Sequence, residues 1–229
     1  MIEAMVELLE VRLEGNGLVG GRISCPARLT LKPGQYLLAH AVNLPEVLPT
    51  VLFPSRTGSR EIILAPTLPS AWLPGAALKL RGPLGKGFHL PAAARRVAMA
   101  ALESHPYRLL PLIAPALAQG FEIALFTPFI PAGLPPEVEV LPIHSLPEAP
   151  SWADYLALDL PLASLPELRM RLGLKAGQSL ACAAEVLVLS SMPCGGRAQC
   201  GVCEVKTLLG WKYACKDGPV FDFNTLELP

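Results

Sequence analysis

The sequence predicts an α+β protein of several domains: an N-terminal antiparallel β-barrel, a central α/β domain with a parallel sheet, and a small cysteine-bearing C-terminal segment. Three observations support this prediction. Short apolar or alternating runs fill residues 1–91, strand and helix patterns alternate over residues 92–181, and four of the six cysteines lie within residues 192–221. We therefore expect domains at 1–91 and 92–181, followed by a segment at 182–229.

The composition is that of a folded protein without an obvious charged partner. Hydrophobic residues make up 52% of the 229 residues and the formal net charge is zero, so nothing favours nucleic-acid binding. Prolines, Gly120 and Glu122 interrupt the longest apolar run, 109–126, so we expect no membrane span. The acidic, alternating N-terminus is unlike a signal peptide, which favours a cytoplasmic location.

The first region consists of short strand-like runs separated by Gly, Pro and Ser. Such runs, with alternating apolar side chains and frequent turn residues, are typical of a small antiparallel barrel or sandwich. We expect strands within residues 5–14, 17–31, 34–42, 48–53, 60–66 and 76–84.

The second region changes its rhythm. Residues 95–102, 121–128 and 137–143 are apolar enough for buried strands, and 106–120 reads as a helix that ends at Gly120. Residues 151–174 are expected to supply helical material with proline breaks. This alternation of strand and helix predicts a parallel α/β sheet.

The third region carries the clustered cysteines. Cys194, Cys200, Cys203 and Cys215 have the spacing C-x5-C-x2-C-x11-C. The glycine-rich loop can wrap three thiolates with backbone amides directed at the sulfurs, and the fourth cysteine would follow a hairpin that turns at Gly210. In a reducing compartment, clustered cysteines are more often metal ligands or redox groups than disulfides.

The spacing favours iron and sulfide but leaves alternatives open. It is similar to the plant-type 2Fe–2S pattern, C-x4-C-x2-C…C, with one extra residue in the first gap. A structural zinc site usually has two C-x2-4-C steps, whereas this segment has one. We expect a small iron–sulfur segment with a 2Fe–2S cluster, and zinc or unligated thiols are the alternatives. Cys25 and Cys182 stand alone in apolar sequence and are expected to be small buried residues.

Residues 192–221 resemble the C-terminal cluster segment of the electron-transfer subunit of class 1B dihydroorotate dehydrogenase, in the ferredoxin-reductase superfamily. The phrase "CKDGPVF", residues 215–221, carries the resemblance most specifically, and "PGQYLL" (33–38) and "RGPLGKGFHL" (81–90) match at the expected places. The resemblance implies a flavin-type barrel, a nucleotide-type α/β domain and a cluster segment. It also implies FAD, a 2Fe–2S cluster and a partner catalytic subunit containing FMN, with electrons passing through cluster and FAD to NAD.

The flavin motif of that family, Arg-Pro-x-Ser, is incomplete here. It aligns with Leu48–Val51, where only the proline is kept, and the family's Gly-Thr pair falls on Ala65 and Pro66. The remaining candidates for FAD contacts are Ser55, Arg56, Gly85 and Gly87. FAD binding is therefore left open.

The nucleotide turn expected after the strand 95–102 also departs from the family. It reads "LESHPYRLLP" and contains no glycine, whereas a pyrophosphate needs close backbone approach and free amides. Glu103 would add a negative charge and Pro106 lacks the amide donor. We expect that NAD is not bound.

Three functions follow from these observations. The first is an electron-transfer subunit that uses a 2Fe–2S cluster with a partner flavoprotein, such as a dihydroorotate dehydrogenase catalytic subunit, in a hetero-oligomer. It would be an oxidoreductase subunit without a complete active site of its own. The second is an FAD-containing NAD(P)H oxidoreductase subunit with atypical motifs. The third is a non-catalytic assembly subunit in which a metal only stabilises the fold.

Overall fold

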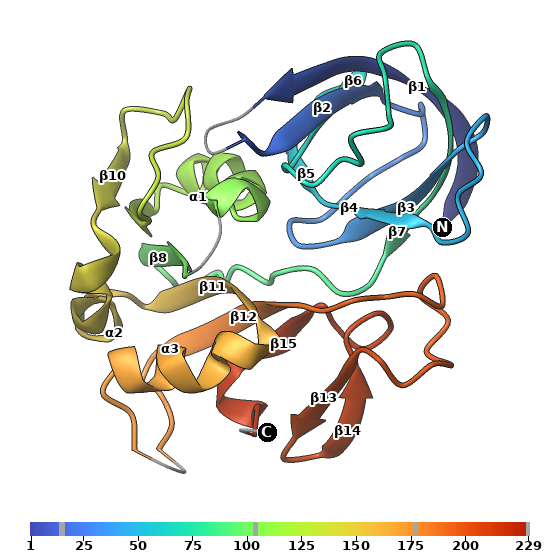
Figure 1. The fold of residues 1–229 in the computed structure, drawn as a ribbon. Coiled ribbons are helices and arrows are strands. Elements are labelled where there is room, and N and C mark those ends of the chain that lie inside the picture. Colours follow the sequence, from blue (N-terminus) through green and yellow to red (C-terminus); the bar gives the residue numbers. More distant parts are fainter. Residues whose placement is uncertain (14–16, 103–104, 176–177, 228–229) are drawn as a thin grey trace.

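The chain forms a barrel, a mixed sheet and a small hairpin, in that order along the sequence (Figure 1). The computed structural model describes residues 1–13, 17–102, 105–175 and 178–227. The expected combination of an antiparallel barrel, a parallel-strand sheet and a C-terminal segment is confirmed.

The barrel has seven strands in the order β4-β3-β7-β1-β2-β6-β5, and every neighbouring pair is antiparallel. The two edge strands are separated in sequence by Phe53 alone, so the sheet nearly closes on itself. Alternate apolar side chains, with the fully buried Trp72, fill its interior. The strands are β1 (Ile2–Leu13), β2 (Val19–Ser24), β3 (Tyr36–Ala41), β4 (Thr50–Leu52), β5 (Pro54–Thr57), β6 (Glu61–Leu64) and β7 (Ala77–Leu84).

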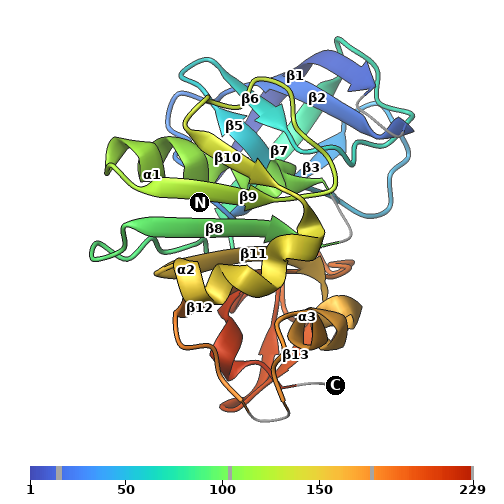
Figure 2. The same cartoon turned by 90° about the vertical axis from the view of Figure 1, so that its left-hand side faces the viewer.

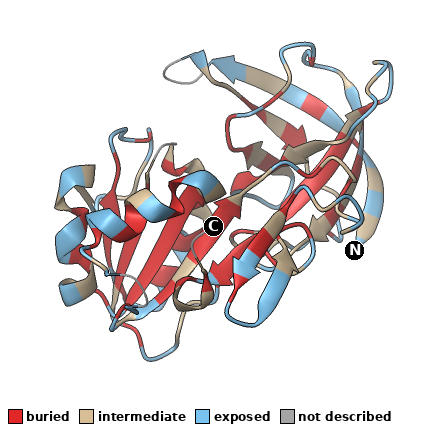
Figure 3. Ribbon diagram, turned by 60° about the horizontal axis from the view of Figure 1, so that its bottom comes forward, coloured by how far each residue is buried: buried red, intermediate tan, exposed pale blue. Residues whose placement is uncertain are grey.

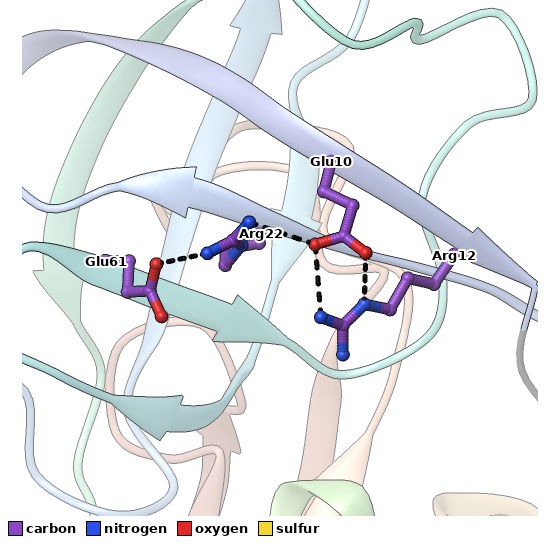
Figure 4. Close-up of polar contacts among 4 residues, drawn as sticks. All are labelled: Glu10, Arg12, Arg22 and Glu61. Carbon is purple, nitrogen blue, oxygen red and sulfur yellow. Dashed lines mark hydrogen bonds and ion pairs between the residues drawn. The ribbon is translucent and has the colours of Figure 1, made fainter.

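An ion-pair network joins three strands on the outer wall of the barrel (Figure 4). Arg22 on β2 lies 3.1 Å from Glu10 on β1 and 2.6 Å from Glu61 on β6, and Arg12 binds the same Glu10 at 2.6 Å. The side chains are 34–48% exposed, so solvent screens these pairs and each contributes little to stability. This part of the wall faces solvent.

The second sheet has the order β10-β9-β8-β11-β12-β15 (Figure 2). Its first five strands are parallel and β15 is antiparallel to β12. The strand order reverses between β8 and β11, which is where open α/β sheets place their ligands. The strands are β8 (Arg96–Ala101), β9 (Glu122–Phe126), β10 (Val138–Leu141), β11 (Tyr155–Pro161), β12 (Ala183–Leu189) and β15 (Val220–Asp222).

The helices of this region are short. The expected helix at 106–120 begins as two 3-10 turns because Pro106 and Pro111 cannot donate backbone hydrogen bonds, and it ends before Gly120, whose φ is +75°. The helices are η2 (Pro106–Arg108), η3 (Leu110–Leu112), α1 (Ile113–Ala118), η4 (Ile143–Glu148), α2 (Ala149–Trp152), η5 (Leu162–Ser164), α3 (Leu165–Arg171) and η6 (Phe223–Thr225).

The expectation of helical material throughout 151–174 is wrong in its first half. Tyr155–Pro161 is β11, a central strand hydrogen-bonded to β8 and β12. Six of its seven residues are buried, because a central parallel strand is covered on both faces. Figure 3 shows strands coloured mostly as buried beside helices that carry exposed residues. A short run that is apolar on both faces has no period that separates a strand from a buried helix.

A second hydrophobic cluster, separate from the barrel interior, joins the barrel to the second sheet. Tyr36, Phe53, Ala65 and Phe88 of the barrel region pack in the same cluster as the central strands. Cys203 and Cys215 belong to this cluster too, so the C-terminal segment is built into the fold. We expected the C-terminal segment to begin at residue 182. β12, which begins at Ala183, pairs with β11 and so lies within the second sheet. Among the described residues, no helix has the length and apolarity needed to cross a membrane.

Candidate iron–sulfur site

A two-stranded hairpin sets the distance between two of the cysteines. β13 (Glu204–Thr207) pairs antiparallel with β14 (Gly210–Tyr213), as the sequence predicts. Cys203 directly precedes β13 and Cys215 follows β14, and the amide of Ala214 donates to the Cys203 carbonyl at 2.9 Å. The hairpin therefore brings these cysteines side by side, and their thiols lie within hydrogen-bonding reach of each other.

A tight loop brings the other two cysteines together. The segment between β12 and β13 runs beneath the barrel before it returns to the hairpin (Figure 1). Gly195, Gly196 and Ala198 have φ of 64°, 75° and 56°, left-handed values that curl the backbone. The Cys194 thiol thereby reaches the Cys200 thiol. The expected role of the two glycines in wrapping the loop is confirmed.

Backbone amides point at the sulfurs. Those of Gln199, Arg197 and Cys200 donate to the Cys194 sulfur and, led by Gln199, lower its pKa to about 6. The amide of Ala198 donates to the sulfur of Cys215, whose pKa burial nevertheless raises to about 12. Amides directed at the sulfurs stabilise negative charge there, which is the arrangement that an iron–sulfur cluster uses.

The two thiol pairs differ in accessibility. Cys203 and Cys215 are 1% and 2% exposed, whereas Cys194 is half-buried and Cys200 is exposed. In the described part of the chain, no three His, Cys, Asp or Glu side chains converge on one metal-ion position. Four thiols arranged two by two fit a 2Fe–2S cluster, in which each iron takes two protein ligands.

Two barrel residues hold this loop in place, and the sequence pattern did not single them out. The hydroxyl of Tyr36 on β3 donates to the Cys215 carbonyl at 2.8 Å. Burial, and then the nearby Cys215 and Cys203, raise the pKa of Tyr36. The Arg81 guanidinium on β7 donates to the Gly195 carbonyl. Both lie in the segments 33–38 and 81–90 that carried the family resemblance, which is the signal that could have found them.

Gly196 has to be glycine in this setting. A Cβ at this position would lie 2.9 Å from the hydroxyl oxygen of Tyr36. The cluster loop is thus packed directly on the outer face of β3 and β7.

The four candidates for FAD contacts separate into two places. Ser55 is buried and donates to the Ile63 carbonyl at 3.2 Å, and Arg56 reaches the Gly133 carbonyl at 3.4 Å. Both line a mainly apolar cavity of about 590 Å³ between β5, α1 and residues 132–135.

Gly85 and Gly87 do not line this cavity. A Cβ on Gly85 would lie 2.6 Å from the Gly218 carbonyl oxygen, and one on Gly87 would lie 2.4 Å from that of Pro33. These glycines allow close packing of backbone segments. Gly85 lets the end of β7 pack closely against Gly218 and Pro219, the residues that precede β15.

The residues aligned with the flavin motif lie apart from the cavity. Leu48 is exposed and, with Pro49, lines a different hollow beside Cys194. Between barrel and sheet stand aromatic rings: those of Tyr36 and Phe53 are 6.0 Å apart, and the Arg108 guanidinium lies 6.0 Å from the Phe53 ring.

A buried ion pair occupies the crevice between β8 and β11. Arg108 contacts Asp159 on β11 at 2.9 Å, and both side chains are almost fully buried. Burial raises the pKa of Asp159, and Arg108 opposes that rise. The Leu102 amide donates to the Asp159 carbonyl at 3.2 Å, closing the end of the crevice.

Aromatic and proline residues cover the neighbouring edge. The His105 ring lies 4.4 Å from that of Phe129 and 5.7 Å from that of Tyr107, and Pro106 follows it. Glu103, which we expected to add a negative charge at this turn, lies outside the described residues.

Comparisons with known proteins agree with the fold and the segment. Residues 190–227 match the model of the iron–sulfur cluster binding domain of dihydroorotate dehydrogenase B. An NADH-dependent reduced ferredoxin–NADP oxidoreductase structure aligns with a TM-score of 0.77 at 15% identity, over 98% of this chain and 90% of that one. The C-terminal segment therefore matches the iron–sulfur domain of dihydroorotate dehydrogenase B, and the chain as a whole has the fold of that oxidoreductase structure.

Other solved structures share this ferredoxin-reductase-like fold. A ferredoxin reductase of carbazole 1,9a-dioxygenase aligns with a TM-score of 0.60 at 18% identity, over 75% of this chain and 65% of that one. Phthalate dioxygenase reductase aligns with a TM-score of 0.53 at 12% identity, over 97% and 77%. No curated protein sequence gives a significant match.

Proposed function

We propose that this chain is an electron-transfer subunit that relays single electrons through a 2Fe–2S cluster held by Cys194, Cys200, Cys203 and Cys215. The observation that carries the proposal is the arrangement of four thiols in two pairs, with backbone amides directed at Cys194 and Cys215. When bound, such a cluster accepts and gives up one electron at a time. The match of residues 190–227 to an iron–sulfur binding domain supports this function.

The protein's own residues supply position, charge stabilisation and protection. The hairpin holds Cys203 and Cys215 in the buried core, where water is excluded. Cys200, in contrast, is exposed to solvent. A protein that donates or accepts electrons can therefore approach the site at this cysteine. Tyr36 and Arg81 fix the loop to the rigid barrel, so little reorganisation would accompany a change of charge.

We propose that NAD binding is lost. The buried Arg108–Asp159 pair fills the crevice at the strand-order reversal, and the His105, Tyr107 and Phe129 rings crowd the adjacent edge. A dinucleotide would have to displace a paired buried charge, which costs several kcal/mol, on the order of 3–5.

A second candidate keeps FAD and is favoured by one observation. The cavity of about 590 Å³ is large enough for part of a cofactor, and Ser55 and Arg56 line it. A yellow protein with stoichiometric FAD that NADH reduces would establish this reading over the first. The third reading, a metal that only stabilises an assembly subunit, rests on the burial of Cys203 and Cys215.

The family further suggests a flavoprotein partner, such as a dihydroorotate dehydrogenase catalytic subunit, in a hetero-oligomer in the cytoplasm. Co-purification of the native chain with its partners, followed by identification of the bound flavin, tests this part. Recovery of the chain alone under mild conditions would contradict it.

The metal assignment is tested by cysteine substitution. Iron and acid-labile sulfide are measured in anaerobically purified protein, and about two of each per chain are expected. Cys203→Ser should remove most of both, whereas Cys25→Ser, which changes a half-buried thiol packed against the barrel core, should retain them. Zinc in place of iron, or unchanged iron in Cys203→Ser, would overturn the assignment. Electron transfer lost along with iron favours the first function, and a loss of stability alone favours the third.

A further inference from the structure

A hollow of about 390 Å³ lies between the outer face of the barrel and the cysteine loop. Its walls come from β1, β3 and β7, from the loop before β4, and from residues 193–197. It shares no lining residue with the larger cavity beside α1. The proposed cluster needs the cysteines but leaves this hollow without a role.

The charged residues of the hollow are mostly positive. Lys79, Arg81 and Arg197 line it together with a single carboxylate, that of Glu3. Lys79 lies 3.5 Å from Glu3, so this pair largely neutralises itself. Arg81 and Arg197 remain as an excess of two positive charges.

Both arginines keep donors for a ligand. Arg81 uses one terminal nitrogen on the Gly195 carbonyl, and a guanidinium has five N–H donors in all. The side chain of Arg197 is exposed, and its backbone amide, not its guanidinium, serves Cys194. Two planar guanidinium groups that line one hollow match the charge of a phosphate monoester, which carries nearly two negative charges, and each can bind phosphate oxygens through parallel N–H donors.

Apolar side chains line the hollow as well. Leu38, Leu48 and Pro49 line the hollow, and Val47 at its rim is 91% exposed. A lining that combines cationic and apolar side chains, in a volume of this size, is the pattern of a small-molecule site. A bare anion would use only half of it.

We propose that this hollow binds a small phosphate monoester with an apolar ring, its phosphate on Arg81 and Arg197 and its ring against Leu48 and Pro49. Cys194 also lines the hollow, so the bound phosphate would place negative charge beside the proposed cluster. The effect of the bound phosphate on the cluster rests on the proposed function, whereas the binding of the ligand does not.

Isothermal titration of the purified, metal-loaded chain with phenyl phosphate tests the binding. We expect saturable binding, at least tenfold weaker for inorganic phosphate and for benzyl alcohol, because each lacks one half of the ligand. Arg197→Gln should weaken phenyl phosphate binding at least tenfold. Arg60→Gln, a matched change at an exposed arginine on the β5–β6 turn, should leave it unchanged.

Three results would overturn the proposal: no saturable heat at about 10 mM phenyl phosphate, equal affinity for inorganic phosphate, or equal weakening by both arginine substitutions. Iron content measured in the same preparations separates this test from that of the proposed function. A normal iron content without phenyl phosphate binding refutes the ligand site alone. Where binding occurs in iron-loaded protein, a ligand-dependent change in the visible spectrum should accompany it, and should be absent in Arg197→Gln.

Discussion

Tyr36 makes the contact that ties the cysteine loop to the barrel, and its removal gives a sharp prediction. The Tyr36→Phe substitution keeps the buried ring and deletes only the hydroxyl that donates to the Cys215 carbonyl at 2.8 Å. We expect the variant to fold, to be less stable, and to lose iron more readily.

The size of the effect follows from burial. Tyr36 is 0% exposed, so water cannot replace the lost donor, and a buried carbonyl left without its partner costs about 1–3 kcal/mol. For a chain of this length, about 2 kcal/mol lowers the melting temperature by about 4–8 °C. The unpaired carbonyl belongs to Cys215, so the loss should fall on the cysteine loop first.

Thermal unfolding measures the stability, and the rate of iron release to a chelator measures the loop. Tyr155→Phe is the matched control, because it deletes the hydroxyl of another buried tyrosine, one that donates to Glu185 on β12. It should also lower stability but leave the rate of iron release near that of the parent. Two results would contradict this prediction: a decrease in the free energy of unfolding of Tyr36→Phe below about 0.5 kcal/mol, or an equal increase in the rate of iron release in both variants.

Three further predictions follow. Ala198→Gly removes the strain of the left-handed φ of 56° and keeps the amide that points at Cys215, so the protein should retain iron and its free energy of unfolding should change by less than about 1 kcal/mol. Ala198→Pro removes that amide and should lower the measured iron-to-protein ratio. Arg108→Leu leaves Asp159 buried without its partner and should lower the free energy of unfolding, measured in urea, by about 3–5 kcal/mol. The double variant Arg108→Leu with Asp159→Leu should lose less, because no unpaired charge remains. Equal losses in the single and the double variant would contradict this coupling. The amides of Arg95 and Arg96 lower the pKa of Asp154 below 3.8, so the stability that Asp154 contributes is present above pH 3.8 and is lost as the pH falls further. Asp154→Asn should therefore reduce the change of melting temperature with pH in this acidic range. A melting temperature that depends on pH as in the parent would contradict this prediction.

Local sequence patterns predicted much of the fold. The alternating runs of the barrel and the hairpin around Gly210 were recognisable because their signals lie within a few residues of each other. The glycine-rich sequence between the cysteines likewise predicted a tightly wrapped loop, and the left-handed φ of Gly195 and Gly196 agrees with it. The strand Tyr155–Pro161 was missed because its two faces are equally apolar.

What sequence reasoning could not find depends on distant parts of the chain. Tyr36 and Cys215 are 179 residues apart, and Arg81 and Gly195 are 114 residues apart. No periodicity connects such pairs, because the packing of the whole barrel against the C-terminal segment creates them. The left-handed conformation of Ala198 could not be predicted for a similar reason, because the amide of Ala198 donates to the sulfur of Cys215, which follows the hairpin.

The central claim is that the four thiols hold one redox-active 2Fe–2S cluster. The most direct measurement is electron paramagnetic resonance of the anaerobically purified chain before and after reduction with dithionite, with the spins counted against protein. The account predicts no signal when oxidised and about one unpaired spin per chain when reduced, as one electron enters a two-iron centre. A spectrum that stays silent after reduction in protein that contains zinc would contradict it.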